Sequence, residues 1–224
     1  TVSSFIHVLF ETEVPRYFMN SVIIATMATV LCICVAIPAA YSFARHNYRG
    51  KNLVMVCILL CNMIPQASTL VPLYRAMDRL QIIDTHFGIA FTHLLCMLPF
   101  SIIMLKGFIR TIPPTLEEAA MIDGCTKLQA IFKIIVPVCS SGIFATAMYA
   151  FMISWEEFLY AMTFSTSSRA RTISIGLKMF STEFKVDWSS ILAAATLMTL
   201  PILILFFMIQ DTFIKGATNG ALKE

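Results

Sequence analysis

The chain has 224 residues, of which 58% are hydrophobic and only 13% are charged, and its formal net charge is +3. This charge is too small, and the Lys and Arg residues are too scattered, for a nucleic-acid-binding surface. Five long stretches contain no Asp, Glu, Lys or Arg. A soluble domain of this size would have to bury all five, so the composition argues against a soluble protein.

The five uncharged stretches cover residues 17–44, 52–74, 85–105, 134–155 and 188–210. About 20 apolar residues in a helix cross the ~30 Å hydrocarbon core of a bilayer, and each stretch is long enough for this. We therefore expect an all-α, polytopic helical membrane protein with five transmembrane helices.

The chain starts without an initiator Met, and its first uncharged stretch does not read as a signal peptide. Glu11 and Glu13 stand before that stretch, where a signal peptide carries positive charge. We expect the natural protein to extend further toward its N-terminus.

The turn after the first stretch is densely basic, with Arg45, Arg49 and Lys51. Such density is typical of a cytoplasmic loop. Alternation along the chain then predicts that residues 106–137 and the C-terminal tail are cytoplasmic, and that residues 165–187 lie outside.

The second stretch carries four polar side chains, Asn62, Gln66, Ser68 and Thr69. Polar groups at membrane depth face protein or water rather than lipid. Two interpretations stay open: the cluster lines a solute path, or it packs against other helices. In the third stretch, we expect His93 to be a packed, hydrogen-bonded side chain rather than a proton relay.

Trp155, Glu156 and Glu157 follow one another near the expected outer end of the fourth stretch. An aromatic belt residue and snorkelling carboxylates are the default interpretation at that depth. The alternative hypothesis is that these side chains face a solute path.

Two short helices are predicted in the 111–137 loop. Capping-box spacing occurs twice, at Thr115/Glu118 and at Thr126/Gln129. Gly124 stands where the first helix would end in a left-handed turn. We expect the helices to be joined at Asp123-Gly124 and the second to end near Pro137.

This bent pair of helices offers a surface for close contact with another protein. Ala119 and Ala120 leave a face with little side chain, and Glu117, Glu118 and Asp123 provide charge around it. The alternative is a solvated amphipathic loop that lies on the lipid headgroups. Spacing alone leaves both interpretations open.

The motifs of several other function classes are missing from the sequence. It has no CxxC pair, and six of its cysteines lie in or beside apolar stretches, where Cys behaves as a small hydrophobe. It has no G-x-x-x-x-G-K-[ST], HExxH or GxSxG motif. The uncharged stretches lack the ionisable relay of an ion-coupled secondary transporter. We therefore expect no metal site and no catalytic residue.

Residues 117–137, EEAAMIDGCTKLQAIFKIIVP, resemble the EAA loop of binding-protein-dependent ABC importer permeases. The matching positions are Glu118, Ala119, Ala120, Gly124, Ile134 and Pro137, with Val136 in place of the usual Leu. Further segments along nearly the whole chain, such as MIPQASTLVPLYRAMDRLQIIDTHFGIA and WEEFLYAM, resemble the sugar-importer branch, and within it the second permease of the maltose type.

The chain departs from the family pattern in two respects. Family members usually have six spans, and the first is absent here, which favours a truncated N-terminus over a natural five-span protein. The usual W-N-E-F pattern reads Trp155-Glu156-Glu157-Phe158, which puts the substrate preference in doubt.

The resemblance implies that residues 1–224 form a single permease domain of a bacterial inner membrane, with a cytoplasmic coupling loop at about 111–137. It implies a second permease subunit, two ATP-binding subunits and an extracytoplasmic solute-binding protein as partners. ATP would be bound by the partner subunits, so this chain would hold no cofactor. The implied solute is a carbohydrate; the alternatives are another small polar solute or, less favoured, an ion-coupled secondary transporter.

Two sets of candidate site residues follow. The candidate ATPase-coupling residues are Glu117, Glu118, Ala119, Ala120, Asp123, Gly124 and Pro137. The candidate solute-path residues are Asn62, Gln66, Trp155, Glu156 and Glu157.

Overall fold

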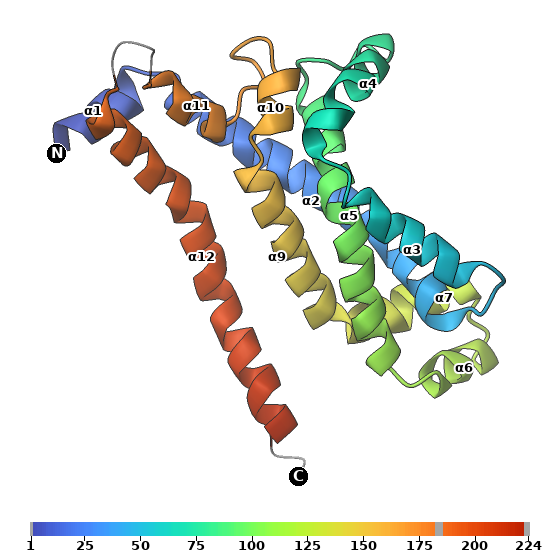
Figure 1. The fold of residues 1–224 in the computed structure, drawn as a ribbon. Helices are drawn as coiled ribbons and strands as arrows, with labels where there is room; N and C mark the ends of the chain where they lie inside the picture. Colours follow the sequence, from blue (N-terminus) through green and yellow to red (C-terminus); the bar gives the residue numbers. More distant parts are fainter. Residues whose placement is uncertain (1, 182–185, 222–224) are drawn as a thin grey trace.

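The structure, a computed structural model, describes residues 2–181 and 186–221, with residues 208–221 described by their backbone alone. Helices make up most of the described chain (Figure 1), which holds no β-strand beyond an isolated bridge between Ser181 and Val186. The predicted all-α fold is confirmed. Residues 182–185 of the expected outer loop and residues 222–224 of the tail lie outside the described residues.

The helices follow one another along the chain with short connections. They are α1 (Val2–Phe10), α2 (Val14–Arg45), α3 (Lys51–Cys61), α4 (Gln66–Arg79), α5 (His86–Thr111), α6 (Thr115–Ile122), α7 (Lys127–Ala130), the π-helical turn η1 (Ile131–Ile135), α8 (Val136–Val138), α9 (Ser140–Glu156), α10 (Leu159–Phe164), α11 (Ile173–Met179) and α12 (Trp188–Ala221).

Three of these helices are long and apolar enough to cross a membrane: α2, α5 and the Trp188–Phe207 part of α12. They coincide with the first, third and fifth uncharged stretches. The second and fourth stretches each form a bent pair of helices. Each pair is one span only if its two helices together cross the membrane. The described residues therefore contain three to five candidate spans, and two of the five predicted helices are broken.

The second stretch breaks between α3 and α4, whose axes meet at 97°. Pro65 lies at the break, with φ of −57° and ψ of 128°. Proline has no N–H to donate, and it disfavours helical conformation in the residue before it. The chain therefore leaves one helix at Asn62 and starts the next at Gln66.

The fourth stretch breaks at Cys139, where the helical segment Lys127–Val138 meets α9 at 81°. Pro137 removes one backbone donor just before this bend, after the π-helical turn. Gly142 then lets α9 approach α5 closely. A Cβ at this position would lie only 2.3 Å from Cγ of Phe108.

The helices α2, α5 and α9 pack together along the middle of the molecule (Figure 1). α2 contributes a stripe of small, fully buried side chains, Ala25, Ala28, Cys32, Ala36 and Ala40. Ile89 and Met97 of α5 share one hydrophobic cluster with the middle of this stripe, and Leu105 shares another with its end. Small residues let membrane helices approach closely, so this stripe sets the spacing of the bundle.

The connecting loops gather at two opposite ends of the molecule. At one end, Arg45 Nη2 donates a hydrogen bond of 2.7 Å to the carbonyl of Ile112, which joins the α2–α3 turn to the 111–137 loop. At the other end, Asp84 accepts hydrogen bonds of 3.1 and 3.2 Å from the N–H groups of Thr166 and Ser167. This arrangement agrees with the alternation predicted from the sequence.

We predict that Asn47 and the 111–137 loop are cytoplasmic and that residues 165–187 lie outside, because the 45–51 turn is basic. In a chain without other cysteines, a Cys at Asn47 should react with a membrane-impermeant reagent only after cells are permeabilised. A Cys at the exposed Arg169, at the opposite end, is the control and should react in intact cells. Labelling at position 47 in intact cells would contradict this orientation.

Candidate functional site

The 111–137 loop folds into α6 and a second helical run formed by α7, η1 and α8. Gly124 follows α6 in a left-handed conformation, with φ of +88°. Its N–H donates to the carbonyl of Met121 (3.1 Å), and the N–H of Cys125 donates to the carbonyl of Ala120 (3.0 Å). This is the Schellman pattern, so the predicted left-handed stop at Gly124 is confirmed.

The two predicted capping boxes have different outcomes. Thr126 Oγ1 accepts the N–H of Gln129 (3.3 Å) and Gln129 Oε1 accepts the N–H of Thr126 (2.8 Å), so the second box is confirmed. The Thr115–Glu118 box is wrong, because no side chain caps α6. Pro114 already has helical values, φ −59° and ψ −27°. Thr115 therefore lies inside the helix and cannot adopt the extended backbone of an N-cap residue.

The outer surface of the loop carries charge beside a small residue. Glu118, Ala119 and Asp123 are exposed, whereas Ala120 is buried. Only one of the two alanines is therefore available for a close contact. Pro137, the last candidate coupling residue, is exposed in α8 next to the bend at Cys139.

The same loop exposes five large apolar side chains that we did not assign to the site from the sequence. Their exposed fractions are 44% for Leu116, 46% for Met121, 86% for Ile122, 65% for Leu128 and 59% for Phe132. The buried side of the second helical run uses Ile131 and Ile135. The sequence does contain a signal for these side chains: the two short helices have more apolar residues than a single buried face requires.

Glu117 points into the molecule rather than outward. Its carboxylate accepts hydrogen bonds from Arg45 Nε (2.5 Å) and from the Tyr41 hydroxyl (2.7 Å), both on α2. The side chains of Arg45 and Glu117 are only 12% and 11% exposed. The charge that we expected on the outer face is instead part of a buried ion pair that ties α6 to α2. Its partners are 72 and 76 residues away in the sequence, which local spacing cannot reveal.

Asn62 and Gln66 line a common hollow of about 260 Å³ at the break between α3 and α4. Cys96 of α5 and Tyr160 of α10 also line it. Gln66 Nε2 donates to Cys96 Sγ (3.2 Å), and Thr69 Oγ1 lies 2.7 Å from the Tyr160 hydroxyl. The structure thus brings together two of the five candidate solute-path residues.

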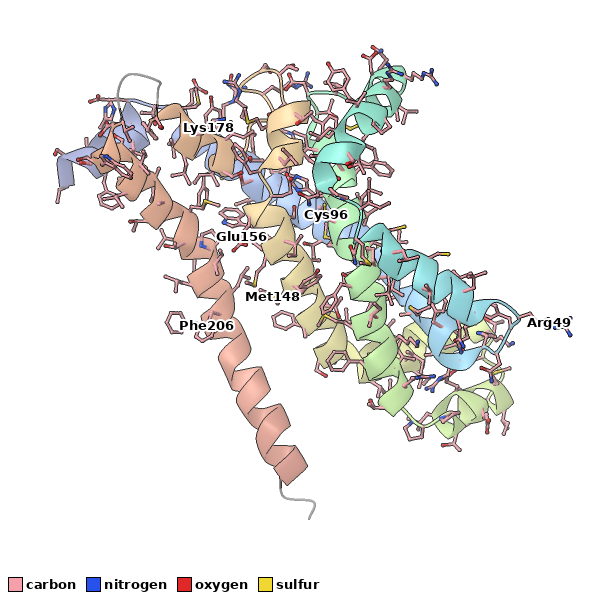
Figure 2. All side chains as sticks on the ribbon, viewed as in Figure 1. Arg49, Cys96, Met148, Glu156, Lys178 and Phe206 are labelled. Carbon is pink, nitrogen blue, oxygen red and sulfur yellow. The ribbon has the colours of Figure 1, made fainter. Side chains whose placement is uncertain are left out.

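The other three candidates do not line this hollow. Trp155 is 1% exposed, stacks against Phe151 and donates from Nε1 to the carbonyl of Met198 (3.1 Å). Glu156 is exposed at the end of α9 (Figure 2). Glu157 is only 8% exposed. The default interpretation of a belt residue and snorkelling carboxylates is therefore wrong for Trp155, which packs among α2, α9 and α12, and for Glu157, because the chain turns inward after α9.

Glu157 joins three helices. Its oxygens accept the N–H groups of Tyr160 (2.8 Å) and Ala161 (3.0 Å) at the start of α10. His93 of α5 is fully buried, with Nε2 3.1 Å from Glu157 Oε2, although off the line of a hydrogen bond, and Nδ1 2.7 Å from Ser154 Oγ. The expected packed, hydrogen-bonded His93 is confirmed. These contacts fix α10, which carries Tyr160 to the hollow.

Among the residues that the structure describes, no group of three His, Cys, Asp or Glu side chains is arranged to hold a metal ion. The seven cysteines are free thiols.

Residues 32–219 match the family of inner membrane components of binding-protein-dependent transport systems. The chain belongs to this family. The match includes the 111–137 loop, and it confirms the resemblance seen in the sequence. The protein is therefore a multi-pass inner-membrane permease of an ABC importer, a transmembrane subunit rather than a catalytic one.

Individual relatives align along the whole chain. The sulfoquinovosyl glycerol transport system permease protein SmoH of Agrobacterium fabrum is 33% identical over 223 residues, which cover 100% of this chain and 78% of that protein. The trehalose/maltose transport system permease protein MalG of Thermococcus litoralis is 31% identical, covering 100% of this chain and 81% of that one. A crystal structure of a bacterial ABC transporter for alginate import has the same fold, with a TM-score of 0.81 at 20% identity over 94% of this chain and 79% of its own.

Proposed function

We propose that this permease forms half of the solute pathway of an ATP-driven importer and is moved by a cytoplasmic ATPase through the 111–137 loop. The five exposed apolar side chains of this loop are the observation that most supports the proposal. Clustered exposed apolar side chains mark contact surfaces. Helices that lie on membranes are rich in Lys and Arg, but α6 has neither and exposes Glu118. The composition of α6 therefore favours a protein partner over lipid headgroups at that helix, whereas the second helical run carries Lys127 and Lys133.

The candidate coupling residues would then act in two ways. Ala119 would allow close approach of the ATPase, with Glu118 and Asp123 presenting charge beside it. Gly124 would set the angle between the two helical segments. Glu117 is a positioning residue in this proposal, since it acts through Arg45 rather than through the partner.

The proposed assembly contains a second permease subunit, two ATP-binding subunits and an extracytoplasmic solute-binding protein. The family description, which specifies dependence on a binding protein, supports the last of these. ATP is bound by the ATPase subunits, and this chain, taken as a single domain over residues 1–224, holds no cofactor.

The packing of the helices suggests how a displacement of the 111–137 loop is transmitted to the solute pathway. The loop is tied to α2 by the ion pair of Glu117 with Arg45, and it continues directly from α5. α2 and α5 pack along their lengths, so a displacement of the loop moves them together. The hollow at the α3–α4 break lies against α5, so such a movement would change its walls.

Gly124→Val should weaken ATPase docking. A Cβ at Gly124 or at Gly107 would meet open space, but only Gly124 has a positive φ. A left-handed backbone costs a residue with a side chain about 1–2 kcal/mol, so Val at position 124 should tilt α7 relative to α6. Gly107→Val is the matched control and should be neutral. The measurements are co-purification of the ATPase and ATP-dependent uptake into proteoliposomes.

Ala119→Asp probes the exposed face directly, because it adds bulk and negative charge there. It should reduce complex yield without changing membrane insertion. If both Ala119→Asp and Gly124→Val retain full complex yield and full uptake, the loop is not the docking element.

We propose a carbohydrate as the solute. The relatives named above are permeases of transport systems for sulfoquinovosyl glycerol and for trehalose and maltose. The hollow offers amide and hydroxyl groups from Asn62, Gln66 and Thr69 beside the Tyr160 ring, a combination that suits sugar hydroxyls and an apolar sugar face. Glu156 stays a candidate because it is exposed, whereas Trp155 and Glu157 would act only by shaping the walls.

Gln66→Met should impair transport while leaving the complex intact. Methionine keeps the volume but loses the hydrogen bonds, and one such bond changes affinity by about tenfold. The KM for sugar uptake should therefore rise by roughly that factor. Thr199→Val on α12, which removes a hydroxyl bonded only within its own helix, is the control. An unchanged KM for Gln66→Met would show that the hollow is not part of the solute pathway.

A further inference from the structure

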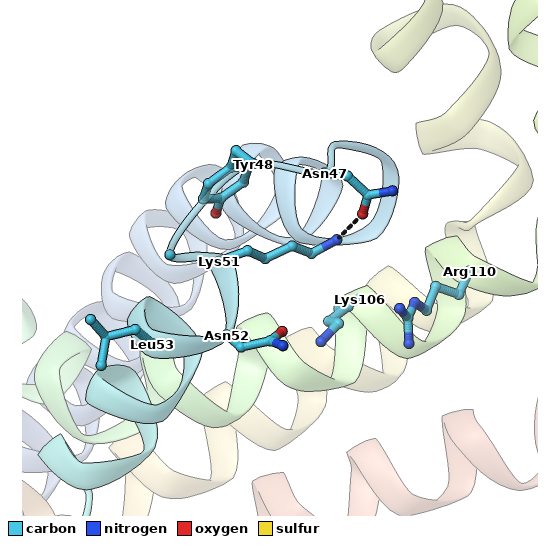
Figure 3. A pocket seen from close by; sticks show the side chains of 8 residues that line it. Asn47, Tyr48, Lys51, Asn52, Leu53, Lys106 and Arg110 are labelled. Carbon is cyan, nitrogen blue, oxygen red and sulfur yellow. Dashed lines mark hydrogen bonds between the residues drawn. The ribbon is translucent and has the colours of Figure 1, made fainter.

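A basic hollow lies between the α2–α3 turn and the last turns of α5. Its volume is about 340 Å³, and its lining includes Asn47 from the turn, Lys51 and Asn52 from the start of α3, and Lys106 and Arg110 from α5. Figure 3 shows Lys106 and Arg110 one turn apart on α5, facing the segment that carries Lys51. Three cations therefore converge on one space.

The hollow has no negative charge of its own. No carboxylate is part of its lining. Lys51 Nζ donates to the carbonyl of His46 (2.8 Å) and to Asn47 Oδ1 (3.3 Å), both neutral groups. Lys106 and Arg110 form no ion pair with any residue that the structure describes. An anion from outside the chain would relieve the mutual repulsion of these three charges.

Glu117, the acidic side chain of the 111–137 loop that points into the molecule, does not serve this purpose. Glu117 is already bound by Arg45 and Tyr41, so its charge is neutralised at a different point of α2. The basic hollow is consequently a separate feature from the ion pair that anchors the loop.

Exposed apolar side chains continue from the hollow along α3. Leu53 lines the hollow and is 67% exposed, and Val56 and Leu60 of the same helix are 49% and 52% exposed. These side chains lie on segments that belong to candidate membrane spans. A ligand that fills the hollow therefore meets cations at one end and an apolar helix surface at the other.

We propose that this hollow binds the phosphate of an anionic phospholipid, whose acyl chains lie along α3. Basic pockets between membrane helices suit such headgroups, because phosphate pairs with several cations while the lipid tails stay in hydrocarbon. The site does not involve the coupling surface or the solute hollow, and it does not depend on which solute is carried.

The test uses the complete importer complex, stripped of lipid and then offered equal amounts of phosphatidylglycerol and phosphatidylcholine with identical acyl chains. Native mass spectrometry counts the lipids that stay bound. The parent should prefer phosphatidylglycerol. In Lys106→Gln/Arg110→Gln this preference should fall by about 20- to 30-fold, because each cation contributes about fivefold. Lys106→Arg/Arg110→Lys keeps both charges and should retain most of it.

The control is Arg75→Gln/Arg79→Gln, which removes the same charge from exposed positions on α4, at the other end of the molecule (Figure 1). It should leave the lipid preference unchanged. An equal fall in this control, or no fall in the Lys106/Arg110 double variant, would overturn the proposal. Glycerol phosphate that displaces phosphatidylglycerol at equal concentration would show a site for free phosphate instead. Loss of the ATPase from the Lys106/Arg110 double variant alone would show a protein contact, and it would equally overturn the lipid site.

Discussion

One buried ion pair, between Arg45 at the end of α2 and Glu117 in α6, joins the 111–137 loop to the membrane helices. Removing one partner of such a pair costs about 3–5 kcal/mol, because the remaining charge is left without compensation. The Tyr41 hydroxyl adds a second bond to the same carboxylate. The loop is thus held to α2, the longest of the central helices, by a contact whose loss costs much free energy. The loop can therefore move together with α2 as one body.

The broken helices supply the complementary property, a place where the bundle can change shape. α2, α5 and α9 pack closely along a stripe of small side chains. The α3–α4 pair, in contrast, bends by 97° at Pro65 and leaves its polar residues around a hollow. Backbone irregularity at membrane depth is tolerated where it is buried in protein or lines a water-filled cavity. The close packing of α2, α5 and α9 beside the polar break between α3 and α4 suits a subunit that must move and still contact a hydrophilic solute.

The sequence could predict what depends on neighbouring residues and not what depends on distant ones. The helices in the uncharged stretches and the left-handed stop at Gly124 follow from local composition and backbone sterics. The expected cap at Thr115 failed for a local reason as well, since the preceding proline took the helical conformation. The burial of Glu117 against Arg45, and the contact of Glu157 with His93 of α5, depend on tertiary packing that no spacing encodes.

The most direct test of this account is the distance between spin labels at Asn47 and Lys127, on either side of the Arg45–Glu117 pair, measured by pulsed electron resonance in the assembled complex. We predict the same narrow distance distribution in the nucleotide-free and ATP-trapped states, because loop and helix move as one body. Glu117→Gln should broaden the distribution, whereas Glu118→Gln, which alters an exposed carboxylate, should not. A shift of this distance on ATP binding in the parent would contradict the account.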